Sequence, residues 1–214
     1  MNIRDYYNNK EEYSPSKQRV KNITELIGKD IKGKRILDIG CGNGKMGSAL
    51  VVKGAVVAGC DISEHAVSIA KQSLQEVFVF DVANDNFSLL KKDFDIIIAS
   101  ELIEHLFSPE EFLLNIKSVM SKESSLILTT PNFLMWTNRI KMLLGRFRYT
   151  KVGFLDESHI HFFTYDSLRE LLKQTGFIIE GEKHIIHPKI PNWLGIMRPN
   201  LFAFQLIIKV KLKK

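Results

Sequence analysis

Residues 36–44 read ILDIGCGNG, and this stretch decides the fold. A short apolar run ends at three alternate glycines, Gly40, Gly42 and Gly44, and a helix-like segment over residues 45–53 comes next. Glycine lets the backbone turn tightly and approach a ligand closely. The pattern predicts a buried strand, a glycine loop and a helix, an arrangement with which α/β sheets bind nucleotide-containing cofactors.

Acidic residues stand after the next two strand-like runs. Asp61 comes directly after residues 55–60 and 19 positions after Gly42, where a carboxylate can accept hydrogen bonds from a ribose diol. Asp81 comes directly after residues 76–80, where a carboxylate can receive an adenine amino group. Because both acids are in register with the glycines, we interpret the loop as a cofactor site and not as a chance turn.

The glycine spacing argues against two familiar nucleotide sites. Nicotinamide and flavin sites use G-x-G-x-x-G, with the third glycine five positions after the first, whereas position 45 here is lysine. Asp38 also stands inside the strand, two residues before the first glycine. A P-loop is excluded because no G-x-x-x-x-G-K-[ST] occurs in the chain.

Strand-like and helix-like segments alternate around this loop. A first helix is expected from Pro15, with Ser14 as its cap and Gly28 at its end. The alternation predicts an α/β protein whose mostly parallel sheet is covered by helices on both faces. The strand-like runs are residues 34–40, 55–60, 76–80, 94–100 and 125–130, and the later helix-like segments are 45–53, 63–74, 109–122 and 165–175.

The alternation breaks after Pro131. Residues 132–163 mix aromatic, apolar and basic side chains, and we interpret them as an insertion that serves as a lid. Residues 177–186 and 201–214 read as two further strands. The second of these alternates apolar residues with lysines at its end, which predicts an edge strand with one face in water.

Composition indicates one globular domain over residues 1–214. The chain is 45% hydrophobic and 25% charged, which excludes general disorder. No apolar run approaches the roughly 18–20 residues that cross a bilayer, and residues 1–13 lack the apolar stretch of a secretory signal. Two cysteines cannot build a disulfide framework or a cysteine-rich zinc site, so we expect a cytoplasmic protein.

The net charge of +6 is unevenly distributed. Residues 139–151 and 183–214 carry five and seven basic residues and no acidic ones. Such segments can meet an anionic substrate, a phosphate-bearing lipid surface or a nucleic acid, or can be no more than a solvated face.

The loop, Asp61, Asp81 and the sequence FDIIIASELIEHL at residues 94–106 together resemble the class I S-adenosylmethionine-dependent methyltransferases. The resemblance covers roughly residues 15–182. It implies a Rossmann-like, seven-stranded sheet with an antiparallel edge strand, and S-adenosylmethionine as the cofactor. It also implies that residues 1–30 form a helical segment that closes over the cofactor, with Tyr6 and Tyr7 as candidate contacts.

The resemblance assigns the cofactor contacts residue by residue. The glycine loop would pass the methionine end, and Arg19 would face the cofactor carboxylate. Asp61 would bind the ribose, Asp81 and Val82 the adenine, and Ser100 would line the methionine moiety. The full set of expected contacts is Arg19, Asp38, Gly40, Cys41, Gly42, Asp61, Ile62, Asp81, Val82 and Ser100.

The residues directly after the fourth strand bear on the identity of the acceptor atom. No Asn/Asp-Pro-Pro-Tyr/Phe quartet stands there, and neither cysteine does, which argues against amino-group methylases of that kind and against cytosine C5 enzymes. Instead, Glu101, Glu104 and His105 have the spacing of side chains that share one face of a helix. At the carboxyl end of a sheet, such a set predicts a divalent-metal or acid–base site.

The pattern E-x-x-E-H with a later histidine resembles two groups of methyltransferases. One is the ubiquinone-type O-methyltransferases, and the other is the small-RNA 2′-O-methyltransferases, in which two Glu and two His hold Mg²⁺ or Mn²⁺. Carried over, the metal ligands would be Glu101, Glu104, His105 and His159, although the spacing around His159 departs from that pattern. His105, Glu104 and His159 are also the candidate catalytic residues, His105 as a general base or a group that positions the acceptor.

These observations predict O-methylation of a small molecule, such as a glycan precursor, a lipid-linked intermediate or a quinone-like phenol. One alternative is a metal-dependent RNA 2′-O-methyltransferase, although no RNA-binding module is recognisable and nucleic acid is the less favoured partner. The other is a non-catalytic module that only binds the cofactor. The basic C-terminus, with Lys209, Lys211, Lys213 and Lys214, suggests peripheral membrane contact, and both a monomer and a homodimer remain open.

Overall fold

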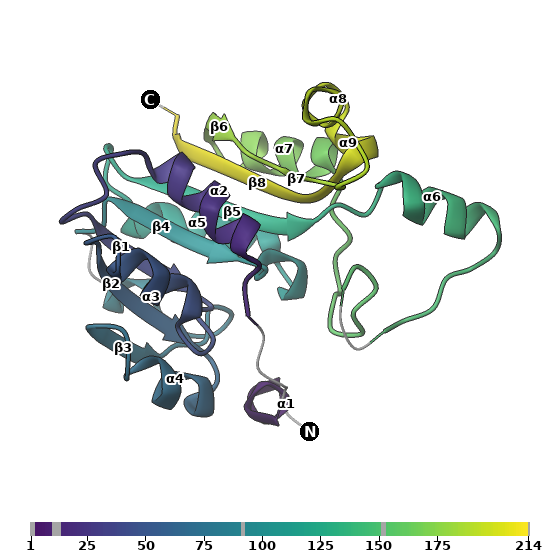
Figure 1. Ribbon diagram of the computed structural model, residues 1–214. Coiled ribbons are helices and arrows are strands. Elements are labelled where there is room, and N and C mark those ends of the chain that lie inside the picture. Colours follow the sequence, from purple (N-terminus) through teal and green to yellow (C-terminus); the bar gives the residue numbers. More distant parts are fainter. Residues whose placement is uncertain (1–2, 10–13, 91–92, 151–152, 214) are drawn as a thin grey trace.

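A computed structural model describes residues 3–9, 14–90, 93–150 and 153–213 (Figure 1). One mixed sheet forms the centre of the molecule. Its strands are β1 (Arg35–Ile39), β2 (Val56–Asp61), β3 (Glu76–Val79), β4 (Ile96–Ser100), β5 (Ser125–Pro131), β6 (Phe177–Glu182), β7 (Ile185–Ile186) and β8 (Ala203–Leu212). The α-helices are α1 (Ile3–Asn9), α2 (Lys17–Ile27), α3 (Lys45–Val51), α4 (Glu64–Ala70), α5 (Pro109–Val119), α6 (Trp136–Leu143), α7 (Tyr165–Gln174), α8 (Asn192–Met197) and α9 (Pro199–Phe202), and short 3₁₀ turns lie at η1 (Phe87–Leu89) and η2 (Ile103–His105).

The sheet order is β3-β2-β1-β4-β5-β8-β6, with β7 paired to the start of β8. Strands β1 to β5 run parallel, and β8 runs antiparallel to both of its neighbours, β5 and β6. The predicted fold class, a mostly parallel α/β sheet with one antiparallel strand, is therefore confirmed.

The predicted edge position of the last strand is wrong. Strand β8 lies inside the sheet and β6 forms the edge, because both sides of β8 are hydrogen-bonded. Ile208 and Val210 are fully buried, while the Nζ of Lys209 makes an ion pair of 3.1 Å with Glu180 of β6. The alternating lysines therefore reflect a long cationic side chain that finds a carboxylate on the next strand, not a strand edge in water.

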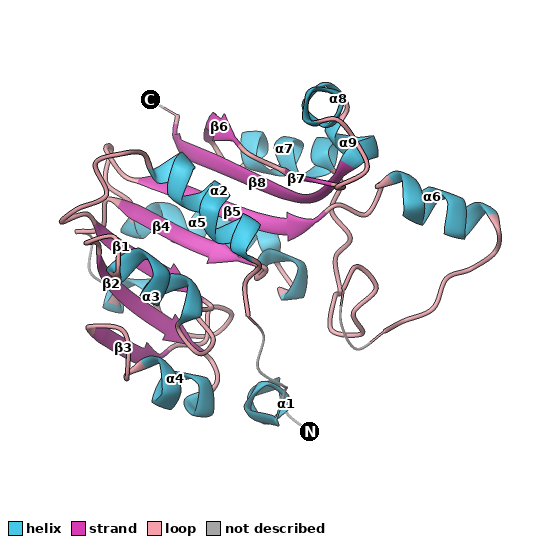
Figure 2. Ribbon diagram, viewed as in Figure 1, coloured by secondary structure: helices cyan, strands magenta, loops and turns pink. Residues whose placement is uncertain are grey.

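Helices cover both faces of the sheet (Figure 2). Ile36 and Ile98 belong to a buried cluster with residues of α2, α3 and α4. Leu37 and Ile97, one position along each strand, belong to a second cluster with residues of α5 and α7. Successive side chains of a strand point to opposite faces, so the near-continuous apolar runs of the sequence supply both cores.

Helix α2 begins later than predicted. Its cap is Ser16 and not Ser14: the Oγ of Ser16 accepts a hydrogen bond of 3.2 Å from the backbone N–H of Arg19. The Oγ of Ser14 instead accepts from the Nζ of Lys45. Gly28 ends the helix, as predicted, with a positive φ of 106°. This register buries the side chain of Arg19 beneath the helix.

Residues 132–163 leave the sheet at the carboxyl end of β5, and α6 projects from the body there (Figure 1). Asn132 holds the start of this insertion, since its Nδ2 donates to the carbonyls of Pro199, Asn200 and Ala203. Near its end, the backbone N–H groups of Ile160 and His161 both donate to the carbonyl of Glu104. None of the helices in the described ranges combines the length and apolar character that a membrane crossing requires.

Candidate active site

The glycine loop joins β1 to α3 at the carboxyl end of the sheet. Gly42 has a φ of 51°, and Gly44, the cap of α3, has a φ of 78° in the left-handed region that favours glycine. A Cβ at position 44 would also lie 3.0 Å from the Cβ of Ala70 in α4. The N–H groups of Gly40 and Cys41 donate to the carbonyl of Cys60 in β2, so the loop is fixed to the neighbouring strand.

Asp61 connects this loop to the end of β2. Its Oδ2 accepts a hydrogen bond of 2.8 Å from the N–H of Gly42, and its Oδ1 accepts one of 2.9 Å from the N–H of Ser63. Burial raises the pKa of the Asp61 carboxyl, and these backbone donors oppose that shift. Each carboxylate oxygen has two lone pairs, so both oxygens keep acceptor capacity for a diol.

The other expected cofactor contacts lie along the same end of the sheet. The carboxylate of Asp81 accepts from Ala83 N–H and from Asn84 Nδ2, both at 2.9 Å. Ile62 and Val82, the residues after the two acids, are half-buried. Ser100 ends β4, and its Oγ lies 3.0 Å from the Oγ1 of Thr129 on β5. These positions are compatible with the contacts expected from the resemblance.

Asp38 is buried in β1, directly beneath the loop. Burial, with a smaller contribution from Asp61, raises the pKa of its carboxyl to about 7, against a hydrogen bond from the Gly47 backbone that lowers it. Its Oδ2 has no hydrogen-bond partner among the described residues. A carboxyl in this setting prefers its neutral form at mildly acidic pH.

Replacing Asp38 with asparagine is expected to reduce the pH dependence of stability. Because the folded pKa lies above the unfolded one, the stability of the wild type is complete below about pH 4 and declines up to about pH 7. At about 1.4 kcal/mol per pH unit, the wild type loses up to about 4 kcal/mol relative to Asp38→Asn across this range. Urea unfolding at several pH values measures the difference. The exposed Asp30→Asn serves as the control, and parallel curves for the wild type and Asp38→Asn would contradict the expectation.

Arg19 and Glu101 form a buried ion pair. The Nη2 of Arg19 lies 3.1 Å from the Oε2 of Glu101, and its Nε donates to the Oε1 of Gln205 on β8. The other carboxylate oxygen of Glu101 accepts from the Oγ1 of Thr129. Arg19, expected to face the cofactor carboxylate, thus faces a protein carboxylate here. The sequence could not predict that Gln205 binds Arg19 or that Thr129 binds Glu101, because each partner is far along the chain from the residue it contacts.

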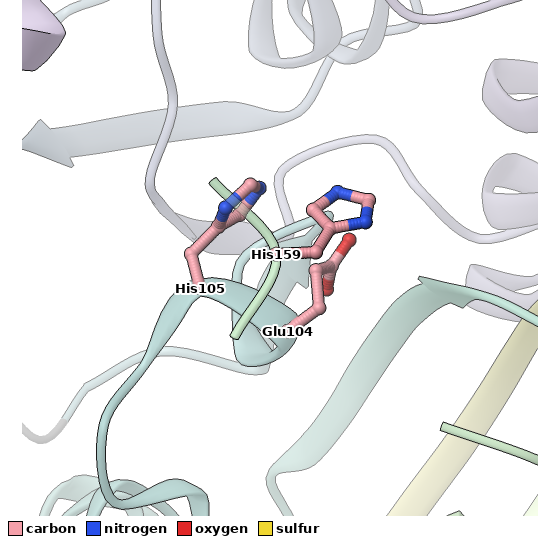
Figure 3. Close-up of side chains that lie close together, drawn as sticks. All are labelled: Glu104, His105 and His159. Atoms are coloured by element: carbon pink, nitrogen blue, oxygen red, sulfur yellow. The ribbon is translucent and has the colours of Figure 1, made fainter. Parts of the chain in front are cut away.

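Glu104, His105 and His159 converge, as Figure 3 shows. One ligand atom from each lies within 4.8 Å of the others, and the two imidazole rings are 4.7 Å apart between centroids. Glu101, the fourth expected ligand, is not part of this group. Glu101 has a φ of 55°, and residues 103–105 form a 3₁₀ turn, so the helical face assumed for the E-x-x-E-H pattern does not exist.

Backbone carbonyls orient both imidazoles. The Nδ1 of His105 lies 3.0 Å from the carbonyl of Ser158, and the Nδ1 of His159 lies 3.2 Å from the carbonyl of Phe154. A carbonyl only accepts, so each Nδ1 carries a proton, and in the neutral imidazole each Nε2 carries the lone pair. The sequence could not reveal these carbonyl partners, since any residue type supplies them.

Glu104 is almost completely buried, and neither oxygen of its carboxylate has a hydrogen-bond partner in the part of the chain that is described. Burial, followed by the charge of Glu101, raises its pKa well above the usual value. A buried carboxylate without partners is costly, so this group requires a proton, a cation or a donor from a ligand. With its raised pKa the carboxyl can meet this requirement by holding a proton, or a bound cation or donor can meet it.

A small pocket adjoins Glu104 and His159. Its wall is aromatic and comes mostly from the insertion, with Thr130 and Pro131 at the end of β5. The aromatic side chains are Phe133, Phe154, Phe162 and Phe163. The sequence pattern did not single out these aromatic side chains as site residues. Tyr7 of α1 contacts the opposite side of the triad, with its ring 6.2 Å from that of His105.

Comparison with known proteins places the chain among methyltransferases. A family model described as a methyltransferase domain matches residues 9–180. A ubiquinone biosynthesis O-methyltransferase of Coxiella burnetii (strain Dugway 5J108-111) is 35% identical over 118 residues, which are 53% of this chain and 50% of that protein. The mitochondrial enzyme of the same name from Schizosaccharomyces pombe is 28% identical over 78% of this chain and 63% of its own length. The chain thus spans about half to two thirds of these relatives.

Solved structures agree on the fold. Magnesium protoporphyrin IX methyltransferase from Synechocystis PCC 6803 with bound SAH superposes with a TM-score of 0.70 at 18% identity, covering 99% of this chain and 98% of that one. A SAM-dependent methyltransferase from Archaeoglobus fulgidus has a TM-score of 0.65 at 20% identity over 90% of this chain and 92% of its own. With the glycine loop, the acids after β2 and β3 and the family match over most of its length, the chain belongs to the methyltransferase domain family and has the class I S-adenosylmethionine-dependent fold.

Proposed function

We propose that this protein transfers the methyl group of S-adenosylmethionine to an oxygen atom of a small-molecule acceptor. The observation that carries the proposal is the convergence of Glu104, His105 and His159 at the end of the sheet that holds the glycine loop. Acceptors bind outside the carboxyl ends of strands in open α/β sheets, so the triad would lie where acceptor and cofactor meet. The cofactor contacts proposed are the full set that the sequence predicts, from Arg19 to Ser100.

The reaction is an in-line displacement at the methyl carbon. The acceptor oxygen forms a bond to that carbon, the bond from carbon to the sulfonium sulfur breaks, and the cofactor leaves as S-adenosylhomocysteine. The acceptor hydroxyl loses its proton to the Nε2 of His159 or His105 where the triad holds no metal ion, and to water where an ion occupies both Nε2 atoms. The aromatic wall beside the triad excludes water and holds the acceptor close to the line of attack.

The triad also fits a divalent metal ion. The buried carboxylate of Glu104 lacks a partner among the described residues, and both imidazoles present the nitrogen opposite the one held by a carbonyl. Glu104, His105 and His159 would hold the ion, which would lower the pKa of a coordinated hydroxyl. Two imidazole nitrogens in the donor set favour Mn²⁺ over Mg²⁺, which prefers oxygen ligands. Glu101 is not proposed as a ligand in this arrangement, because it pairs with Arg19.

Among the acceptors considered, a quinone-like phenol is supported best. The phenylalanines beside Glu104 offer flat apolar surfaces, which suit a planar ring better than a glycan. The relatives from Coxiella burnetii and Schizosaccharomyces pombe are named for O-methylation in ubiquinone biosynthesis. A phenol also needs less activation than an alcohol, since its pKa is about 10.

The remaining features of the proposal concern the chain around the site. Helix α1 would cover the cofactor: the Oδ1 of Asn8 lies 2.9 Å from the Oγ of Ser63, at the start of α4. The insertion 132–163 would act as the lid over the acceptor. Cys41 and Cys60 are buried free thiols, as suits the reducing cytoplasm that we expect.

The membrane contact predicted for the C-terminal lysines has less support. Lys209 is engaged with Glu180, and Lys211 lies within β8. Lys214 lies outside the described residues. Sedimentation or light scattering would distinguish a monomer from a homodimer in solution.

A screen with S-adenosylmethionine labelled on its methyl group tests the proposal. Phenolic, glycan, lipid and RNA acceptors are compared, before and after chelation with EDTA and after return of Mn²⁺ or Mg²⁺. We expect label in a phenolic product, lost on chelation and restored better by Mn²⁺. Activity that withstands EDTA would contradict the metal site but not the transfer. Label that enters only RNA, with binding that weakens steeply in salt, would replace the small-molecule proposal with the 2′-O-methylation of RNA.

A further inference from the structure

Helix α6 has an inverted distribution of polarity. Its buried side chain is the polar Asn138, whose Nδ2 donates to the carbonyl of Phe133. The apolar residues Ile140, Leu143 and Leu144, at the spacing of one helical face, are exposed, and Leu143 is 86% exposed. An amphipathic helix on a globular protein normally directs its apolar stripe to the core, so this stripe faces something other than the protein.

Helix α8 presents a second apolar surface. Gly195 is buried against Ile186, where a Cβ would lie 2.5 Å from the Cδ1 of that residue, so α8 packs onto β7 through its glycine. The side chains of Trp193, Ile196 and Met197 are directed away from this contact and are 63%, 72% and 68% exposed. A tryptophan with this exposure is typical of sites where a side chain is apolar on one side and wet on the other.

The two surfaces lie at the same end of the molecule. Trp136, the first residue of α6, contacts the ring of His187, five residues before α8, with 5.9 Å between ring centroids. Figure 1 shows α6 beyond the end of β5 and α8 above the start of β8, both far from β3 at the other edge of the sheet. We call this surface the α6–α8 face and define it by Leu143, Leu144, Phe147, Trp193, Ile196 and Met197.

Basic side chains accompany the apolar ones. Arg139, Lys141, Arg146 and Arg148 are exposed in and after α6, and Arg198 follows α8. Residues 132–150 and 183–213 include no aspartate or glutamate. Apolar side chains bordered by cations and lacking anions are the chemistry of helices that lie in the interface of an anionic bilayer.

We propose that the α6–α8 face is a docking surface for an anionic lipid bilayer. The proposal does not depend on the identity of the acceptor. A second copy of the chain is the less suitable occupant, because joining two such faces would bring their cations together. Docking would place the insertion, which carries His159 and the aromatic pocket, at the surface of the membrane.

Vesicle co-sedimentation of the full chain tests the proposal. We expect binding to vesicles of phosphatidylcholine with phosphatidylglycerol and little binding to phosphatidylcholine alone. The double variant Leu143→Ser/Leu144→Ser is expected to bind about tenfold more weakly, since binding scales with the apolar area inserted. The matched control Val52→Ser/Leu89→Ser removes two exposed apolar side chains elsewhere and should bind like the wild type. Arg146→Gln/Arg148→Gln should weaken binding, and Lys53→Gln/Lys71→Gln should not.

Tryptophan fluorescence gives an independent measurement. The chain has two tryptophans, and entry of Trp193 into the interface should shift the emission to shorter wavelength on addition of anionic vesicles. Trp193→Phe should abolish this shift. Equal vesicle binding by the leucine variant and its control would overturn the proposal. The proposal would also be overturned if the wild type bound no vesicles and instead formed a dimer in solution that Leu143→Ser/Leu144→Ser dissociates. A midpoint of thermal unfolding equal to that of the wild type verifies that each variant is folded.

Discussion

Asp61→Ala is expected to weaken the binding of S-adenosylmethionine at least about 100-fold, a loss of about 2.7 kcal/mol. The carboxylate has two functions that the substitution removes together. It accepts the N–H groups of Gly42 and Ser63, which holds the glycine loop against the end of β2. It also offers acceptors for the ribose diol, and hydrogen bonds to a charged group contribute about 1.5–3 kcal/mol each. Calorimetric titration measures both affinity and stoichiometry.

Two further variants make this result specific. Asp30→Ala removes an exposed carboxylate outside the glycine loop and should leave the affinity unchanged. Asp61→Asn keeps an acceptor oxygen for one backbone donor and should bind with intermediate affinity. Unaltered binding by Asp61→Ala would show that the loop does not hold the cofactor, and the proposed function would lose its basis.

His159→Ala is expected to lower kcat for methyl transfer by about 100- to 10,000-fold, the usual contribution of a general base. The affinity for S-adenosylmethionine should stay within a few-fold of the wild type, because His159 belongs to the insertion and not to the glycine loop. If a metal ion fills the triad, the variant should also lose metal binding measured by calorimetry. Steady-state kinetics with the acceptor found in the screen gives kcat and KM separately.

His161→Ala is the matched control for this variant. His161 lies two residues further along the same segment and lines the same pocket, but its Nε2 lies 3.2 Å from the carbonyl of Phe107 and it does not belong to the triad. If kcat falls modestly in His161→Ala and strongly in His159→Ala, the loss of activity is due to the triad and not to a general disturbance of the insertion. A chain that binds the cofactor but transfers no methyl group in any arm of the screen would be the non-catalytic module instead.

The parallel part of the fold was predictable because its signals are local. The glycines after β1 and the acids after β2 and β3 stand at strand ends that the apolar runs already mark. The position of β8 inside the sheet was not predictable, because strand order depends on pairing between segments far apart in the sequence. Lys209 reads as a solvent-facing residue until Glu180 on the adjacent strand is known.

The cluster of Glu104, His105 and His159 was partly predictable for a similar reason. Glu104 and His105 are adjacent in the sequence, and the histidines of the insertion were recognisable as candidates. The helical face assumed for Glu101, Glu104 and His105 is wrong, because Glu101 has a positive φ and residues 103–105 form a 3₁₀ turn. Gln205 and Thr129 could not be recognised in the sequence as partners of Arg19 and Glu101, since amide and hydroxyl side chains are common on strands.

The main-chain hydrogen bonds between the insertion and η2 separate the positioning of the triad from the recognition of the acceptor, two tasks that many enzymes combine. Ile160 and His161 are held to the carbonyl of Glu104 by main-chain groups, and the main-chain carbonyls of Ser158 and Phe154 orient the two imidazoles. The rest of the insertion can therefore change its sequence while the reactive groups keep their spacing. Selection for a new acceptor would act on Phe133, Phe154 and their neighbours, and an exchange of residues 133–155 between relatives should transfer substrate preference without rebuilding the chemistry.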